Sequence, residues 1–154
     1  MDGNFLLAVD SNKTLRQMIV AGEYDWVNYH INQTRFPIKG AGLTYFEARL
    51  FNFGDTPDSR EVVRRIKLYD TSHPWKVASL EHLLSLGALL PHEQQKYRIV
   101  AIRSVVLVRL RICVPTLGWG HPLAKRHLDL SLWEYPWSDT HQFLAVRPLP
   151  PPTK

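Results

Sequence analysis

Between residues 94 and 128 the chain carries seven basic side chains and no acidic one. Inside this stretch, residues 99–114 form the longest run of strand-forming residues, and its even-numbered positions are apolar with one exception. Alternation with a period of two is typical of a strand with one buried and one exposed face. The odd-numbered Arg103, Arg109 and Arg111 would then lie on the exposed face. We therefore predict a sheet whose outer face is basic.

The length of this run sets a second condition on the fold. An uninterrupted strand of 16 residues would be far longer than the usual length of about five or six. The run is therefore expected to bend, to bulge or to fold back as a hairpin, although no Gly, Asn or Pro marks a turn within it. We predict the break at residues 103–104.

The composition is that of a globular protein. The chain has 154 residues, 45% of them hydrophobic and 21% charged, which is the size of one ordinary domain. It has no run of about 18 apolar residues that could span a membrane, and its N-terminus lacks the basic start and long apolar core of a signal peptide. A single cysteine, Cys113, cannot form an internal disulfide. These features predict a cytoplasmic protein without a membrane partner.

The net charge of +5 is unevenly distributed along the chain. Residues 1–78 contain ten basic and nine acidic side chains, whereas residues 79–154 contain nine basic and five acidic ones. A basic half predicts an acidic partner, either nucleic acid or an acidic protein surface. The alternative is that the charge serves only to keep the chain soluble.

Three short helices are expected from their end signals. Ser11 or Asn12 can cap a first helix, which Gly22 ends. Asp55, followed by Thr-Pro, is a helix-start signal, and this second helix would run to about residue 68. Ser79 can cap a third helix, whose leucines recur at helical spacing.

Strand-like segments occupy much of the remaining chain: residues 5–9 (a strand or a terminal segment packed on the core), 26–29, 43–53, 128–133 and 143–146. Two glycines within residues 116–122 predict a loop there. The fold class is therefore α+β: a single domain over residues 1–147, with a mainly antiparallel sheet and about three short helices packed on one face. The Pro-rich residues 148–154 are expected to form an extended or disordered tail.

The sequence contains no enzyme signature. It has neither a phosphate-binding glycine loop nor a Gly-x-Ser-x-Gly nucleophile motif. A zinc site needs three or four convergent ligands, usually in closely spaced pairs, and the spacing of His121, His127, His141 and Cys113 provides no such pair. We therefore predict no metal and no cofactor. A hydrolase that uses His127 or His141 is the least favoured hypothesis.

Three tryptophans, Trp119, Trp133 and Trp137, lie close to the basic stretch in the sequence. Aromatic rings beside arginines on a sheet are typical of single-stranded nucleic-acid binding, because bases stack on the rings while guanidinium groups hold phosphates. The alternative is that these rings anchor the core and the loops.

Together these features favour a non-enzymatic binding protein. Our first hypothesis is an accessory protein whose basic sheet face, residues 94–128, contacts nucleic acid or a ribonucleoprotein. The second is a protein-interaction module or inhibitor anchored by aromatic loops around Trp119 and Trp137. The cations expected to bind nucleic acid or another anion are Arg103, Arg109, Arg111, Lys125 and Arg126.

Overall fold

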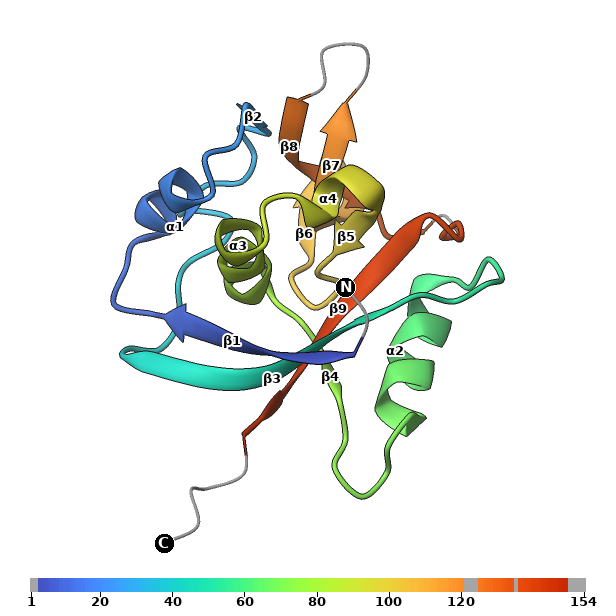
Figure 1. Cartoon of the computed structure of the whole chain (residues 1–154). Helices are drawn as coiled ribbons and strands as arrows, with labels where there is room; N and C mark the ends of the chain where they lie inside the picture. The colour runs from blue at the N-terminus through green and yellow to red at the C-terminus, as the bar shows by residue number, and fades with distance from the viewer. Residues whose placement is uncertain (1–2, 121–124, 135, 150–154) are drawn as a thin grey trace, which may run out of the picture.

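The computed structural model describes residues 3–120, 125–134 and 136–149. Within these ranges the chain forms one nine-stranded sheet and four helices, so the α+β class is confirmed (Figure 1). The strands are β1 (Asn4–Asp10), β2 (Trp26–Val27), β3 (Leu43–Phe51), β4 (Lys76–Val77), β5 (Arg98–Val100), β6 (Val106–Val108), β7 (Arg111–Gly120), β8 (Lys125–Leu132) and β9 (His141–Pro148). The helices are α1 (Leu15–Ala21), α2 (Ser59–Leu68), α3 (Leu80–Leu89) and α4 (Glu93–Lys96).

The sheet is mixed rather than purely antiparallel. Its strand order is β1-β3-β9-β5-β7-β8-β2, with β4 paired to β9 and β6 paired to β7. Most neighbours are antiparallel, but β5 runs parallel to β9 and β2 runs parallel to β8. The parallel pair at the centre arises because the chain between β5 and β9 passes through the β7–β8 hairpin before it returns.

Helices cover both faces of the sheet, so the prediction that they pack on one face is wrong. Helix α3 packs with Leu144 and Val146 of β9 in one core cluster, whereas α2 packs with Phe143 and Ala145 of the same strand in a second cluster. In Figure 1, α3 lies on one side of the diagonal β9 ribbon and α2 lies on the other. Successive residues of a strand point to opposite faces, and all four of these residues are apolar. Strand β9 therefore requires a cover on each face.

The helix ends agree with the expected signals in part. Gly22 follows α1, and Ser79 precedes α3 as its N-cap, as predicted. Helix α1 begins two or three residues later than predicted, and α2 begins three residues later. The reason is that the side chains of Thr14 and Asp58 make the capping hydrogen bonds of α1 and α2. Asp55 instead accepts hydrogen bonds from Arg65, about two turns into the helix, at 2.7 and 2.8 Å.

The basic run folds back on itself as a hairpin. The chain leaves β5, bends through residues 101–105 and then pairs β6 with β7. The expected break at residues 103–104 lies within this bend, and the hairpin is one of the three expected arrangements. The hairpin turn is Arg109–Leu110, and both residues have positive φ, at 51° and 65°. The turn shifts the alternation, so Leu110 and Ile112 are exposed and Cys113 is buried. The prediction that the even-numbered apolar residues share one buried face is wrong at these positions.

Two other boundaries differ from the prediction. Strand β7 continues to Gly120, because Gly118 and Gly120 pair with His127 and Lys125 of β8, so the predicted loop at 116–122 is wrong over its first five residues. Residues 121 and 122 lie outside the described ranges. Strand β9 extends to Pro148, which pairs with Phe46 at the edge of the predicted tail, and residues 150–154 also lie outside the described ranges.

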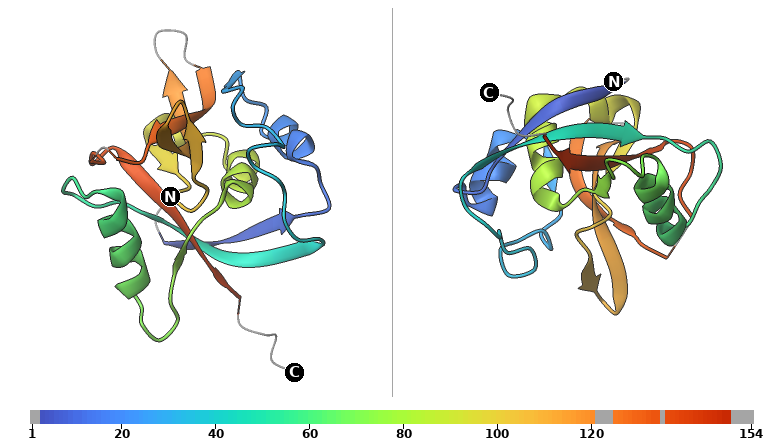
Figure 2. Two further views of the ribbon diagram at one scale, coloured as in Figure 1. Left: turned by 180° about the vertical axis from the view of Figure 1, so that it is seen from behind. Right: turned by 90° about the horizontal axis from the view of Figure 1, so that it is seen from below.

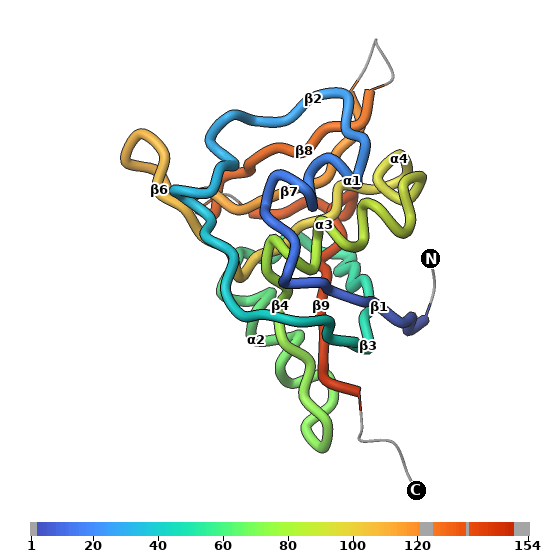
Figure 3. Tube along the Cα trace, turned by 90° about the vertical axis from the view of Figure 1, so that its left-hand side faces the viewer, coloured from blue at the N-terminus to red at the C-terminus, as the bar shows by residue number. Residues whose placement is uncertain are grey.

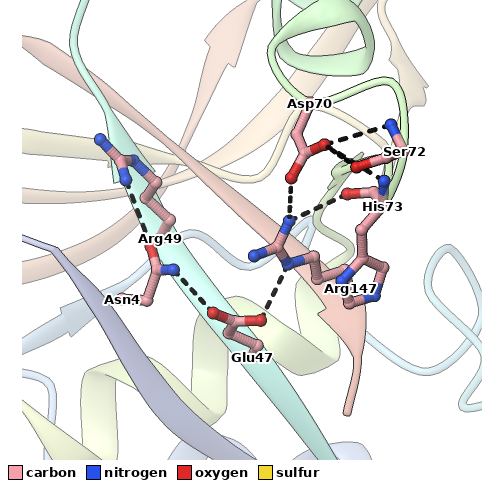
Figure 4. Close-up of polar contacts among 7 residues, drawn as sticks. All are labelled: Asn4, Glu47, Arg49, Asp70, Ser72, His73 and Arg147. Carbon is pink, nitrogen blue, oxygen red and sulfur yellow. Dashed lines mark hydrogen bonds and ion pairs between the residues drawn. The ribbon is translucent and has the colours of Figure 1, made fainter. Parts of the chain in front are cut away.

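One partly buried arginine joins three parts of the fold (Figure 4). Arg147 of β9 donates from Nε to Glu47 of β3 at 2.8 Å, and from Nη1 to Asp70 at 3.1 Å. The same Nη1 reaches the carbonyl oxygen of His73 at 2.9 Å, and the guanidinium lies 4.1 Å from the ring centroid of Trp75. We refer to these five residues as the Arg147 cluster.

Candidate functional site

The predicted cations do not form one continuous surface. Arg111 is the first residue of β7. Lys125 is the first residue of β8 and pairs with Gly120, the last residue of β7. A strand rises about 3.3 Å per residue, so these two ends of the β7–β8 ladder lie about 30 Å apart. Arg109 lies in the turn next to Arg111, Arg103 lies before β6 at the base of the hairpin, and Arg126 lies beside Lys125. The basic stretch is therefore divided into two groups.

Arg126 is held by the interior of the protein and offers little of its guanidinium to an anion. Its Nη1 donates to the carbonyl oxygen of Gly22, its Nη2 to that of Gly87 at 2.9 Å, and its Nε to the side chain of Gln94 at 3.2 Å. The guanidinium also lies 4.9 Å from the ring centroid of Tyr24. The prediction that Arg126 lies on an open binding face is corrected accordingly: it ties β8 to three other segments.

The tryptophans differ in their exposure. Trp137 is 3% exposed, and its indole nitrogen donates to the hydroxyl of Ser59 at 2.9 Å. It belongs to the second core cluster, against which Trp133 packs while partly buried. Trp137 therefore cannot be an interaction anchor, because a partner could not reach its ring. Trp119 is half-buried beside Arg98.

The β6–β7 hairpin projects from the body of the protein, as Figure 3 and the right-hand view of Figure 2, seen from below, show. Four of its apolar side chains are exposed to solvent: Val105, Leu107, Leu110 and Ile112. Leu110, in the turn, is 90% exposed. Of the arginines on the hairpin, Arg111 donates to Glu134, whereas Arg109 is exposed in the turn.

Cations from two other segments gather at the base of this hairpin. Arg35 and Lys39, in the chain that follows β2, line a hollow of about 240 Å³ together with Arg103. Desolvation lowers the pKa of His30, and the charges of Arg35 and Arg109 lower it further, so both arginines lie in the neighbourhood of His30. Glu81 also lines this hollow, where its Oε2 accepts from the hydroxyl of Ser79 at 2.9 Å, but within the described ranges no carboxylate lies within ion-pair distance of these four cations. We call Tyr29, Arg35, Lys39, Arg103, Leu107, Arg109 and Leu110 the hairpin surface.

Hydrogen bonds to the N-terminus of α3 fix the base of the hairpin. The backbone of Arg103 donates to the carbonyl oxygen of Ala78 at 3.0 Å, and the backbone of Leu80 donates to the hydroxyl of Ser104 at 2.7 Å. Burial, with a smaller contribution from the charge of Arg103, lowers the pKa of His82 to about 4. His82 is therefore neutral near pH 7 and accepts from the backbone of Ser79 at 3.0 Å.

The sequence contains no sign that Arg35 and Lys39 belong to this surface. They precede Arg103 by more than 60 residues, and only the return of the chain past the hairpin brings them together (Figure 3). Tyr29 was missed for the same reason. Its ring is 74% exposed and lies 4.0 Å from the ring of His30, centroid to centroid.

The residues of the hydrolase hypothesis do not form a nucleophile site. Burial raises the pKa of the Cys113 thiol, which disfavours the reactive thiolate. His141 lies on β9 and His127 on β8, with β5 and β7 between them. His121 lies outside the described ranges, and the residues within them contain no group of three or more His, Cys, Asp or Glu side chains that could hold a metal ion.

No helix in the described part of the chain is both long and apolar enough to cross a membrane. Comparison with known proteins identifies no matching family, no similar curated protein and no similar solved structure. The function is therefore inferred from the contacts, exposure and charges of the chain itself.

Proposed function

We propose that this chain is a non-enzymatic binding protein that contacts nucleic acid through the hairpin surface. The observation that supports the proposal is the convergence of Arg35, Lys39, Arg103 and Arg109, from separate segments, without a carboxylate partner in the described ranges. Cations that are not neutralised by the protein are available to phosphates. Two of the five predicted cations, Arg103 and Arg109, belong to this surface, and two further cations come from the chain after β2. Arg111, Lys125 and Arg126 are left out.

The surface favours a single strand over a duplex. Arginine and lysine side chains bind phosphates in either form, but the exposed ring of Tyr29 can stack only on a base that is not already paired and stacked. The hairpin carries Arg109 at its tip, so a strand that lies across the base could be contacted from two sides. Single-stranded RNA or DNA, free or within a ribonucleoprotein, is the proposed partner.

Fluorescence anisotropy with labelled single-stranded and duplex oligonucleotides tests this proposal. Four phosphate contacts to a single strand predict that log K falls against log salt with a slope of about −3. The double variant Arg103→Glu/Arg109→Glu should lose binding at moderate salt, because each substitution replaces attraction to phosphate by repulsion. Tyr29→Ala should weaken single-strand binding by about 1–3 kcal/mol, the range for one base–aromatic stack.

The matched control is Arg60→Glu/Lys67→Glu. Both residues are exposed on α2, away from the hairpin (Figure 1), and this variant has the same net charge as Arg103→Glu/Arg109→Glu. Equal loss of binding in the two double variants would show that net charge alone attracts the nucleic acid and would contradict a defined surface. A salt slope near zero would also contradict the proposal.

The apolar tip of the hairpin supports a second candidate, a protein-interaction module. Exposed apolar side chains that cluster on a projecting element are typical of interaction sites, and Leu107, Leu110 and Ile112 are all exposed here. An acidic protein surface would also be attracted to Arg103 and Arg109. The uncharged variant Leu110→Ser separates the two candidates: it should abolish binding to a protein partner and, because it leaves the charge of the surface unchanged, keep the affinity for nucleic acid nearly unchanged.

A further inference from the structure

A second polar hollow, of about 390 Å³, lies on the sheet between β5, β7 and β8. The strand register places Arg98, Gly118 and His127 side by side across the three strands. His127 of β8 pairs with Gly118 of β7, and Arg98 of β5 is next in register to Gly118, because Ile99 pairs with Leu117. Paired residues point to the same face of a sheet. Arg98 and His127 therefore flank Gly118 on the same side.

Gly118 is the floor of this hollow. Its φ is not in the left-handed region, and a Cβ placed there would meet no atom within 4 Å. Backbone strain and crowding therefore do not require glycine at this position. The absence of a side chain leaves open the space between Arg98 and His127, which belong to strands on either side of β7.

Groups able to bind a ligand surround this floor. Asp129 accepts hydrogen bonds from Asn28 at 3.0 Å and from the backbone of Leu130 at 2.7 Å, and both reach Oδ1. Its second oxygen, Oδ2, can accept from a ligand. Ser131 and Thr116 also line the hollow, and their hydroxyl oxygens lie 3.0 Å apart. The guanidinium of Arg98 is exposed and has no carboxylate partner within the described residues.

The hollow is supported from the opposite face of the sheet. Gln94 of α4 is buried, and its Nε2 donates to the carbonyl oxygens of Gly118 at 2.8 Å and of His127 at 3.1 Å. Arg126 in turn bonds to the side-chain oxygen of Gln94. A buried amide thus joins β7 to β8 directly behind the floor. On the open side, the ring of Trp26 lies edge-on to the His127 ring at 5.5 Å.

We propose that this hollow binds a small phosphate ester that also carries hydroxyl groups, such as a sugar phosphate or a mononucleotide. Arg98 supplies the charge-assisted hydrogen bonds that planar guanidinium groups make with phosphate, and a ring nitrogen of His127 donates a further one. Asp129 accepts from a sugar hydroxyl through Oδ2. The volume lies within the range of small-molecule sites, and a neighbouring hollow of about 260 Å³ shares Arg98 and Trp119 with it.

Isothermal titration calorimetry on the full chain tests the proposal with three probes: ribose 5-phosphate, adenosine 5′-monophosphate and inorganic phosphate. Both esters should bind more tightly than inorganic phosphate, because only the esters offer a hydroxyl to Asp129. Binding of ribose 5-phosphate alone among the esters identifies a sugar-phosphate site, and tighter binding of the nucleotide identifies a nucleotide site. If neither ester binds, or if inorganic phosphate binds as tightly as both, the proposal is wrong.

Variants locate the binding within the fold. Gly118→Leu should abolish ester binding by filling the floor, and Arg98→Met should weaken it by about tenfold or more, as expected for the loss of hydrogen bonds to a charged group. The control is Gly54→Leu, since a Cβ at Gly54 also meets no atom within 4 Å. If Gly118→Leu does not fold, the affinities of Gly118→Ala and Arg98→Met for the esters still test the proposal. Unchanged ester affinity in Arg98→Met would overturn the proposal.

The hollow and the hairpin surface can be tested separately. Arg98→Met should keep the hairpin-dependent affinity for oligonucleotides, and Arg103→Glu/Arg109→Glu should keep the affinity for the esters. Failure of nucleic-acid binding would therefore leave the proposed phosphate-ester site intact, and the reverse also holds.

Discussion

The Arg147 cluster and the hairpin surface use the same side chain for different purposes. Arg147 is 12% exposed at its side chain and bonds to two carboxylates, whereas Arg103 and Arg109 are exposed and, among the described residues, have no carboxylate within ion-pair distance. Glu47 and Asp70 are far from Arg147 in the sequence. The difference shows that the acceptors that the fold places around an arginine, and not the local density of arginines, determine which cations can bind a partner.

The largest effect that distinguishes the two regions is expected for Arg147→Ala. This substitution leaves Glu47 and Asp70 without their partner and removes the cation over Trp75, so the free energy of unfolding should fall by about 3 kcal/mol. Arg103→Ala, the matched control, should change it by no more than about 0.5 kcal/mol. Urea unfolding followed by tryptophan fluorescence measures both. Equal losses would remove the distinction between a structural and a free arginine.

Arg126→Ala should have the next largest effect, because Arg126 is structural without any carboxylate. Its loss leaves the carbonyl oxygen of Gly87 and the side-chain oxygen of Gln94 without a donor. We expect a fall of about 2 kcal/mol in the free energy of unfolding, measured in the same way. Lys125→Ala, at the neighbouring exposed position, is the control. A neutral result for Arg126→Ala would return Arg126 to the set of cations available for binding.

The pH dependence of stability sharpens the comparison further. Hydrogen bonds from Arg147 are the main cause of the lowered pKa of Glu47. Asp70 has its pKa lowered to about 2, mainly by hydrogen bonds from Ser72 and the backbone of His73 and in part by Arg147. A folded-state pKa below the unfolded value means that the stabilisation is present above the unfolded pKa, about 4, and is lost as pH falls through the folded pKa.

Unfolding measured at a series of pH values from about 5 down to about 2 should therefore show a steeper loss of stability in the wild-type protein than in Arg147→Ala. Both proteins keep the Glu61 carboxylate, whose pKa is lowered to about 2 by Arg64 and Arg65, so neither curve should be flat. This difference between the two pH curves is expected to be smaller than the loss of unfolding free energy caused by Arg147→Ala or Arg126→Ala at neutral pH. The reason is that Glu47 and Asp70 keep part of their exposure to water. Parallel curves would contradict a role for Arg147 in setting these pKa values.

Local signals in the sequence were sufficient to predict the class of the fold and several of its element ends. Ser79 and Gly22 bound helices because capping depends on residues within one turn of the helix end. The continuous apolar run at 143–146 is typical of a strand buried on both faces, and it is the signal that could have predicted helices on both sides of the sheet. Polar pairing across the fold leaves no such local signal, which is why the partners of Arg126 and Arg147 could not be foreseen.

The candidate site was predictable only in part. Arg103 and Arg109 were identified because they lie in the basic stretch, whereas Arg35 and Lys39 join them through the path of the chain. The turn at Arg109–Leu110 could not be predicted either. Two-residue hairpin turns with positive φ favour Asn-Gly or Asp-Gly, and this turn contains neither pair. The length of the run predicted a bend, a bulge or a fold-back, and the expected break at residues 103–104 lies in the bend before β6. No residue type marked the reversal at residues 109–110.

The smallest expected change in stability concerns the turn at Arg109–Leu110. Leu110 has a φ of 65° and is 90% exposed, so its side chain gains little from packing while its backbone is held in a conformation that disfavours a Cβ. Leu110→Gly should therefore stabilise the protein by about 1 kcal/mol. Leu110→Ala, which removes the same side chain but keeps the Cβ, should not stabilise it. Urea unfolding of the two variants separates backbone strain from side-chain exposure.

The same pair of variants tests why a strained, exposed leucine occupies the tip. If the tip contacts a protein partner, Leu110→Gly and Leu110→Ala should weaken that contact to a similar extent although only one of them relieves the strain. If the hairpin surface acts only through its cations, both variants should bind oligonucleotides like the wild-type protein. A stabilised Leu110→Gly variant that has lost binding would show that Leu110 is retained for recognition at the expense of stability, in contrast to Arg147, which serves stability alone.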